Sequence, residues 1–89
     1  MSEKVIVFDT TLRDGEQAAG VCFSERDKLE IASRLAAMRV DVIEAGFPAA
    51  SDAEARAVAA VARAVRDATI CGLARAVAAD VDAAAEAVR

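Results

Sequence analysis

Apolar residues along the chain form three short runs separated by segments with helical spacing. The first run, VIVF at residues 5–8, is continuously apolar and β-branched, which is typical of a strand covered on both faces. Two further stretches, VDVIEA at residues 40–45 and TICGLA at residues 69–74, are mainly apolar. Each run is followed by polar or turn-forming residues. The pattern therefore predicts three short strands joined by loops and helices.

The segments between the runs carry helix-start signals. Ser24, followed three residues later by Asp27, forms a capping-box pattern that predicts a helix from about residue 25 to 37 or 38. The residues around Ser51 repeat the cap signal and predict a second helix, and residues 80–89 predict a third. Apolar side chains spaced three and four residues apart mark the faces expected to be buried. These are Ile31, Leu35 and Met38 in the first helix and Val58, Val61 and Val65 in the second.

The resulting order is βαβαβα, with successive strands beginning roughly 30 to 35 residues apart, the length of a strand, a helix and a return. Alternation at this spacing predicts parallel strands with right-handed crossovers, in a doubly wound sheet or a (β/α)₈ barrel. Such a barrel typically needs about 250 residues, and three strands in isolation would leave open sheet edges. We therefore expect residues 1–89 to be the N-terminal βαβαβα portion of a (β/α)₈ TIM barrel whose remaining units lie outside this chain.

Composition narrows the function classes. The net charge is −4 and aromatic residues make up 3% of the chain, with no basic run, so we expect no nucleic-acid partner. No apolar run approaches the roughly 20 residues of a membrane span, and the N-terminus shows no signal peptide. Cys22 and Cys71 lack metal-ligand spacing, which favours reduced thiols in a cytoplasmic protein. An inert barrel fragment or an assembly module stays open as the alternative to an enzyme.

The densest polar stretch follows the first strand. Residues 8–17 read FDTTLRDGEQ, and the carboxyl ends of parallel strands are where α/β proteins place their chemistry. Asp14 is suited to a hard divalent cation, and Arg13 offers forked donors to a carboxylate or a developing oxyanion. Gln17 could contact a substrate or cofactor, or cap the loop. A surface salt bridge between Arg13 and Asp14 is the alternative interpretation.

Glu44 is the second candidate, because it places a carboxylate at the end of an otherwise apolar strand. If the first two strands are adjacent and parallel, Glu44 and Arg13 lie at the same rim, and a buried glutamate needs a partner of that kind. A strand-end carboxylate in contact with solvent is the alternative. Arg75, after the third strand, is a weaker candidate for the same rim.

Three stretches carry a family resemblance: FDTTLRDGEQ at residues 8–17, VDVIEAGFP at 40–48 and ICGLARA at 70–76. They resemble the 2-isopropylmalate synthase and homocitrate synthase family, acetyl-CoA-dependent condensing enzymes on a metal-bearing (β/α)₈ barrel. The second stretch favours the synthases that condense acetyl-CoA with 2-oxoisovalerate to give 2-isopropylmalate and CoA in leucine biosynthesis. Residues 18–22 (AAGVC) are closer to some homocitrate synthases. Homocitrate synthase, citramalate synthase and a carbon–carbon lyase similar to HMG-CoA lyase stay open as alternatives.

The resemblance also implies residue roles. Asp14 matches a ligand of the divalent metal, Mg²⁺ or Mn²⁺, and Arg13 matches a catalytic arginine that also binds substrate. Glu44 matches a catalytic, substrate-proximal glutamate, and Gln17 matches a substrate-binding position. The family completes its metal site with a His-x-His pair, whereas this chain contains no histidine. The resemblance therefore implies a homodimeric enzyme whose other ligands lie elsewhere, and residues 1–89 alone are expected to be inactive.

Overall fold

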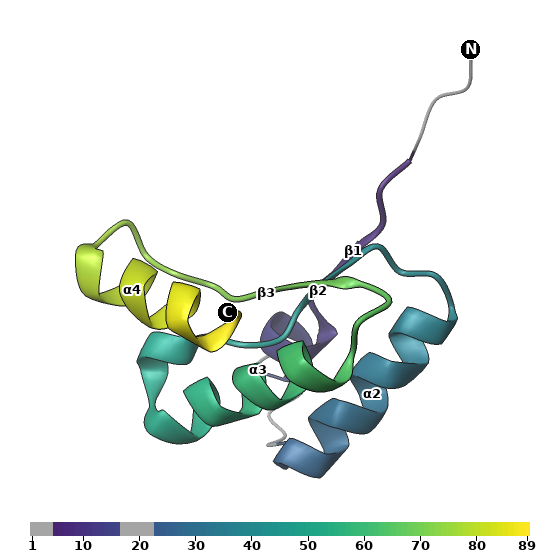
Figure 1. Cartoon of the computed structure of the whole chain (residues 1–89), viewed down its shortest axis with the longest axis horizontal. Coiled ribbons are helices and arrows are strands. Elements are labelled where there is room, and N and C mark those ends of the chain that lie inside the picture. The colour runs from purple at the N-terminus through teal and green to yellow at the C-terminus, as the bar shows by residue number, and fades with distance from the viewer. Residues whose placement is uncertain (1–4, 17–22) are drawn as a thin grey trace.

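The computed structural model describes residues 5–16 and 23–89, which form a parallel sheet with helices packed against it (Figure 1). The elements alternate as the sequence predicts, with two short helical turns added after the first and second strands. In order they are β1 (Phe8–Asp9), η1 (Thr11–Gly15), α2 (Glu25–Ala37), β2 (Val42–Glu44), η2 (Pro48–Ala50), α3 (Asp52–Ala64), β3 (Thr69–Cys71) and α4 (Ala78–Ala87). None of the described helices is long and apolar enough to cross a membrane.

The three strands lie in the order β1-β2-β3 and all pair in parallel. Phe8 is in register with Val42, and Ile43 is in register with Ile70. Right-handed crossovers between strands in sequential order place every connecting helix on the same face of a sheet. Figure 1 shows α2, α3 and α4 gathered on one side of the strands. The predicted α/β fold with a parallel sheet is confirmed.

The first strand is shorter and more exposed than predicted. The expected strand over residues 5–8 was to be covered on both faces, but β1 begins only at Phe8, and the residues from Val5 to Phe8 are 48% to 81% exposed. The physical reason is that the described helices lie on one side of the strands only, and β1 has a neighbouring strand on one side only. Its pairing begins where the Val7 carbonyl accepts the amides of Asp41 and Val42, at 3.1 and 3.0 Å. This apolar run therefore lacks the covering layer that its composition predicts.

Helix α2 has the predicted start, and two of its three predicted stripe residues, Ile31 and Leu35, are partly buried and pack against the core. The capping box is present, with the Asp27 amide 3.1 Å from Ser24 Oγ and the Ser24 amide 3.2 Å from Asp27 Oδ2. Met38, expected in the buried stripe, is instead 69% exposed, because the helix ends at Ala37 and the chain turns away through Arg39 at a φ of 67°. The side chains that α2 buries fully are Lys28 and Ala32.

Helix α3 buries more residues than α2 or α4 does. Its predicted stripe is confirmed, because Val58 and Val61 are completely buried and Val65 nearly so. Leu12 of η1 is also fully buried, so the turn after β1 is anchored in the same core as the helices. The buried cluster joins the strands, the first turn and the helices into one body. Its members are Leu12, Ala32, Val40, Ile43, Ala45, Val58, Val61, Val65 and Ala87.

Candidate functional site

The turn after β1 determines where Arg13 and Asp14 lie. The carbonyl of Thr10 accepts the amides of Arg13, Asp14 and Gly15, at 3.1, 2.8 and 3.1 Å, so the chain winds into one wide π-helical turn. Such turns are rare and are found often at functional sites. With Leu12 buried on one side of the turn, the neighbouring polar residues are held at the end of the strand.

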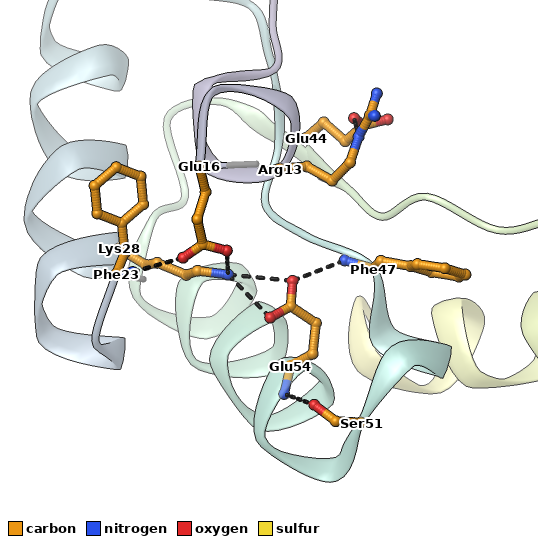
Figure 2. Close-up of polar contacts among 8 residues, drawn as sticks. All are labelled: Arg13, Glu16, Phe23, Lys28, Glu44, Phe47, Ser51 and Glu54. Atoms are coloured by element: carbon orange, nitrogen blue, oxygen red, sulfur yellow. Dashed lines mark hydrogen bonds and ion pairs between the residues drawn. The ribbon is translucent and has the colours of Figure 1, made fainter. Parts of the chain in front are cut away.

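Arg13 and Glu44 meet across the two strand ends. The parallel register of β1 and β2 brings η1 beside the last residue of β2, and Arg13 Nε donates to Glu44 Oε1 at 2.6 Å. The Arg13 side chain is 23% exposed and that of Glu44 is 10% exposed. Figure 2 shows these two side chains meeting at the rim. A carboxylate as buried as Glu44 requires a charged or hydrogen-bonded partner. The prediction that these two residues share a rim is confirmed.

Asp14 lies beside this pair but faces solvent. Its side chain is 64% exposed, and its Oδ1 is 3.7 Å from the nearer Arg13 nitrogen, beyond hydrogen-bond distance. An exposed carboxylate at a strand end is chemically suited to be one ligand of a hard cation. Within residues 5–16 and 23–89, no three His, Cys, Asp or Glu side chains converge to hold a metal ion. Asp14 thus fits a metal site as one ligand, and its role stays a prediction. Gln17 lies outside the described residues.

A buried ion network lies beneath the rim, and the sequence analysis did not predict it. Lys28 is 1% exposed, and its Nζ is 3.2 Å from both carboxylate oxygens of Glu54 and 3.8 Å from Glu16 Oε1 (Figure 2). One signal could have revealed it. Lys28 lies four and seven residues before Ala32 and Leu35, on the face of α2 that packs against the core.

The two carboxylates of this network also bind backbone amides. Glu54 Oε1 accepts the amide of Phe47 at 3.0 Å, and Glu16 Oε2 accepts the amide of Phe23 at 2.6 Å. The backbone of Glu54 is itself capped, because its amide donates to Ser51 Oγ at 3.1 Å. No buried side-chain nitrogen or oxygen in the described part of the chain lacks a hydrogen-bond partner. Every buried polar side-chain atom of this network therefore has a hydrogen-bond partner.

Arg75 does not join Arg13 and Glu44. Its guanidinium forms a two-point contact with Asp80, with Nε 2.7 Å from Oδ2 and Nη2 3.1 Å from Oδ1, and it lies 5.8 Å from the centre of the Phe47 ring. The Arg75 hydrogen bond holds the pKa of the Asp80 carboxyl below its usual range, although burial opposes this shift. Asp80 also accepts the Arg75 amide at 3.0 Å. Helix α4 starts at Ala78, two residues before the predicted start at residue 80.

Cys71, the last residue of β3, lies near the rim as a free thiol. Burial raises the pKa of this thiol, and the negative charge of Glu44 raises it further. A thiol with a raised pKa is largely protonated at neutral pH, and the thiolate is the nucleophilic form. Cys71 is therefore poorly suited to act as a nucleophile in this site. Cys22 lies outside the described residues.

Comparison with known proteins places this arrangement in a family. The HMGL-like family matches residues 4–89. Over 88 residues, 99% of this chain, the sequence is 60% identical to the 2-isopropylmalate synthase of Nitrosococcus oceani, of which it covers 17%. It is 56% and 58% identical, over its full 89 residues, to the 2-isopropylmalate synthases of Nitrosospira multiformis and Heliobacterium modesticaldum, of which it covers 18% and 17%. The chain spans under a fifth of these relatives, and it belongs to the HMGL-like family.

Proposed function

We propose that this chain is part of an acyltransferase that condenses acetyl-CoA with 2-oxoisovalerate to give 2-isopropylmalate and CoA, the first committed step of leucine biosynthesis. The observation that carries the proposal is the identity of 53% to 60%, over 98% or more of the chain, with relatives named 2-isopropylmalate synthase. The contact between Arg13 and Glu44 supports it with a charge arrangement suited to this chemistry.

The proposed reaction forms one carbon–carbon bond and breaks one thioester. A base outside the described residues takes a proton from the methyl group of acetyl-CoA, and the resulting carbon attacks the ketone carbon of 2-oxoisovalerate. Negative charge then develops on the ketone oxygen, which takes up a proton to become a hydroxyl. Water cleaves the thioester and releases CoA, which makes the overall reaction effectively irreversible.

Arg13 is placed to stabilise the developing negative charge. Its Nε–H is bound by Glu44, which fixes the plane of the guanidinium, while the two η nitrogens carry the remaining donors of the fork. Donors that are already oriented when charge develops lower the barrier without reorganising. Glu44 therefore orients Arg13 and adds a carboxylate next to the substrate, as the resemblance implies.

The proposed metal, Mg²⁺ or Mn²⁺, would be held by Asp14 together with ligands outside this histidine-free chain. When bound, a divalent cation supplies charge that polarises a ketone and orients a 2-oxo acid. The exposed carboxylate of Asp14 next to Arg13 supports this assignment. Gln17 is proposed as a substrate-binding residue because it ends the same polar stretch.

The proposal includes the architecture of the whole domain. The order β1-β2-β3, with the helices on one side, suits a segment of a (β/α)₈ barrel, and it differs from the 2-1-3 order that opens a flavodoxin-like sheet. Residues 1–89 are proposed to be one part of that catalytic domain. A homodimer and a cytoplasmic location are proposed on the family resemblance, with small molecules as the only substrates.

The test is CoA release by the intact natural polypeptide that contains this segment. Thiol release from acetyl-CoA is followed with Mg²⁺ or Mn²⁺ and each of 2-oxoisovalerate, 2-oxoglutarate and pyruvate. Preference for 2-oxoisovalerate is the expected result. Preference for 2-oxoglutarate or pyruvate would replace the proposal with homocitrate or citramalate synthesis, and cleavage of a hydroxyacyl-CoA without condensation would replace it with a lyase. Residues 1–89 alone should give no turnover, because they supply only part of the site.

A further inference from the structure

Lys28 is a buried cation in a position where an apolar residue would serve packing equally well. It is one of the largest fully buried side chains of the described residues, and it lies on the core face of α2. Removing an ammonium group from water is costly unless close carboxylates compensate, and well-packed apolar residues often replace buried ion pairs without loss of stability. A lysine here therefore calls for an explanation other than stability alone.

The two carboxylates that contact Lys28 come from the two loops that form the rim. Glu16 directly follows η1, the turn that carries Arg13. Glu54 lies in the first turn of α3, and it binds the amide of Phe47, three residues after Glu44. Lys28 therefore links the loop after β1 to the loop after β2, beneath the place where Arg13 and Glu44 touch (Figure 2).

Gly46 indicates independently that the position of Glu54 is specified. A Cβ atom at position 46 would collide with the Glu54 carboxylate and would approach Val58 Cγ2 to 3.0 Å. The carboxylate is thus packed against bare backbone of the β2 loop, between the strand end and Phe47. A side chain at position 46 would therefore require Glu54, whose carboxylate ends a flexible side chain, or Val58 to shift. The Glu54 carboxylate thus occupies the space that the missing Cβ of Gly46 leaves open.

We propose that Lys28 is a positioning residue, which holds the loops after β1 and β2 so that Arg13 and Glu44 keep their 2.6 Å contact. It acts through Glu16 and Glu54, whose carboxylates it draws together. The ammonium group lies beneath the rim, so its contribution to the reaction passes through the arginine and the glutamate. The activity part of the test rests on the proposed function, and the exchange part does not.

The first experiment compares Lys28→Met with Arg34→Met in the intact natural polypeptide. Arg34 is the matched control, since it is a cation of the same helix in an ion pair with Glu30, 3.1 Å apart and exposed. We expect Lys28→Met to lower kcat by about 10- to 100-fold, because displacement of a catalytic group by about 1 Å costs on that order. KM for the 2-oxo acid should change by less than about threefold, since the lost interaction strengthens only in the transition state. Arg34→Met should match the wild type. An unchanged kcat in Lys28→Met would overturn the proposal.

A second experiment separates positioning from general destabilisation. In a Glu44→Gln background the charged contact with Arg13 is already weakened, so Lys28→Met should lower kcat by less than about threefold further. If Lys28 acts independently of this contact, the two losses multiply, which would contradict the proposal.

A further variant controls for charge repulsion, because Lys28→Met leaves the carboxylates of Glu16 and Glu54 facing each other. The variant Lys28→Met/Glu54→Gln removes this repulsion, and it should still show the loss in kcat. Wild-type turnover in this double variant would equally overturn the proposal.

Amide hydrogen exchange tests the same linkage without any assay of turnover. The amides of Phe23 and Phe47 are held by the two carboxylates that Lys28 joins. Their exchange should accelerate at least about tenfold in Lys28→Met and stay unchanged in Arg34→Met. If the wild type condenses no 2-oxo acid, the proposed function fails, and exchange still decides the role of Lys28. Unchanged exchange at both amides in Lys28→Met would refute the linkage.

Discussion

Two arginines follow strands of this sheet, and their partners differ. Arg13, after β1, is mostly buried and binds Glu44 at the end of the neighbouring strand, 31 residues away in sequence. Arg75, after β3, is 72% exposed and binds Asp80 of its own following helix, five residues away. The first contact joins two strand ends, whereas the second closes one loop.

The difference shows that residue type and strand-end position are not sufficient to identify a site residue. Arg13 is held at the rim because its partner belongs to another strand and because Leu12 anchors the turn beneath it. Arg75 is drawn toward α4 because Asp80 takes up its fork in a two-point contact. The origin of the partner therefore separates the two arginines, because Arg13 is held between two strand ends and Arg75 within its own loop.

Substitution of each arginine by lysine tests this comparison with the largest expected effect. Arg13→Lys in the intact natural polypeptide should lower turnover at least roughly 100-fold, since losing an oxyanion donor costs about 2.7–4 kcal/mol and a point charge does not replace the fork. Arg75→Lys should stay within about threefold of the wild type. The measurement is steady-state CoA release. Equal losses of turnover in Arg13→Lys and Arg75→Lys would contradict the different roles assigned to the two arginines.

Asp14, the acidic residue beside Arg13, gives the next largest expected effect. Asp14→Asn should raise the Mg²⁺ or Mn²⁺ concentration needed for half-maximal activity by at least about tenfold, because even residues that only support metal ligands typically alter affinity 10- to 100-fold. A metal titration of activity measures this change. Asp82, an exposed carboxylate in α4, provides the matched control as Asp82→Asn, which should titrate as the wild type does. An unchanged midpoint for Asp14→Asn would remove Asp14 from the metal site.

The smallest expected effect concerns stability near Asp80. Its pKa in the folded state is lowered, chiefly by the hydrogen bond from Arg75. The contact therefore stabilises the fold above the unfolded-state pKa of about 3.9, and this contribution is lost as the pH falls through the lower folded-state pKa. Asp80→Asn should reduce the free energy of unfolding at pH 7, and the difference from the wild type should shrink below about pH 4. Denaturant unfolding of both proteins, at pH 7 and below about pH 4, measures this difference. A difference that is independent of pH would show that ionisation of Asp80 is not involved.

Local signals made much of the fold predictable from sequence. The capping box of Ser24 and Asp27 and the stripe of Val58, Val61 and Val65 are confirmed, because caps and helical periodicity depend on residues close in the chain. The spacing of the apolar runs also predicted parallel strands. With that topology, the contact between Arg13 and Glu44 followed from two strand ends meeting at one rim.

Features that depend on distant neighbours could not be predicted in the same way. The run at residues 5–8 has the composition of a covered strand, but covering depends on elements packed beside it, and these side chains are exposed. Met38 fits the helical period but lies past the point where α2 ends. The ion network of Lys28 is not among the predictions, because its partners, Glu16 and Glu54, are 12 and 26 residues away in the sequence.

The most direct test of the central claim, that Arg13 and Glu44 act as one unit in turnover, is a double-mutant cycle. Turnover is measured for Arg13→Lys, Glu44→Gln and the double variant of the intact natural polypeptide. If the pair acts as a unit, each single variant is impaired, and the double variant falls within about threefold of the more impaired one. If the two single losses multiply in the double variant, the residues act independently, and the central claim is wrong.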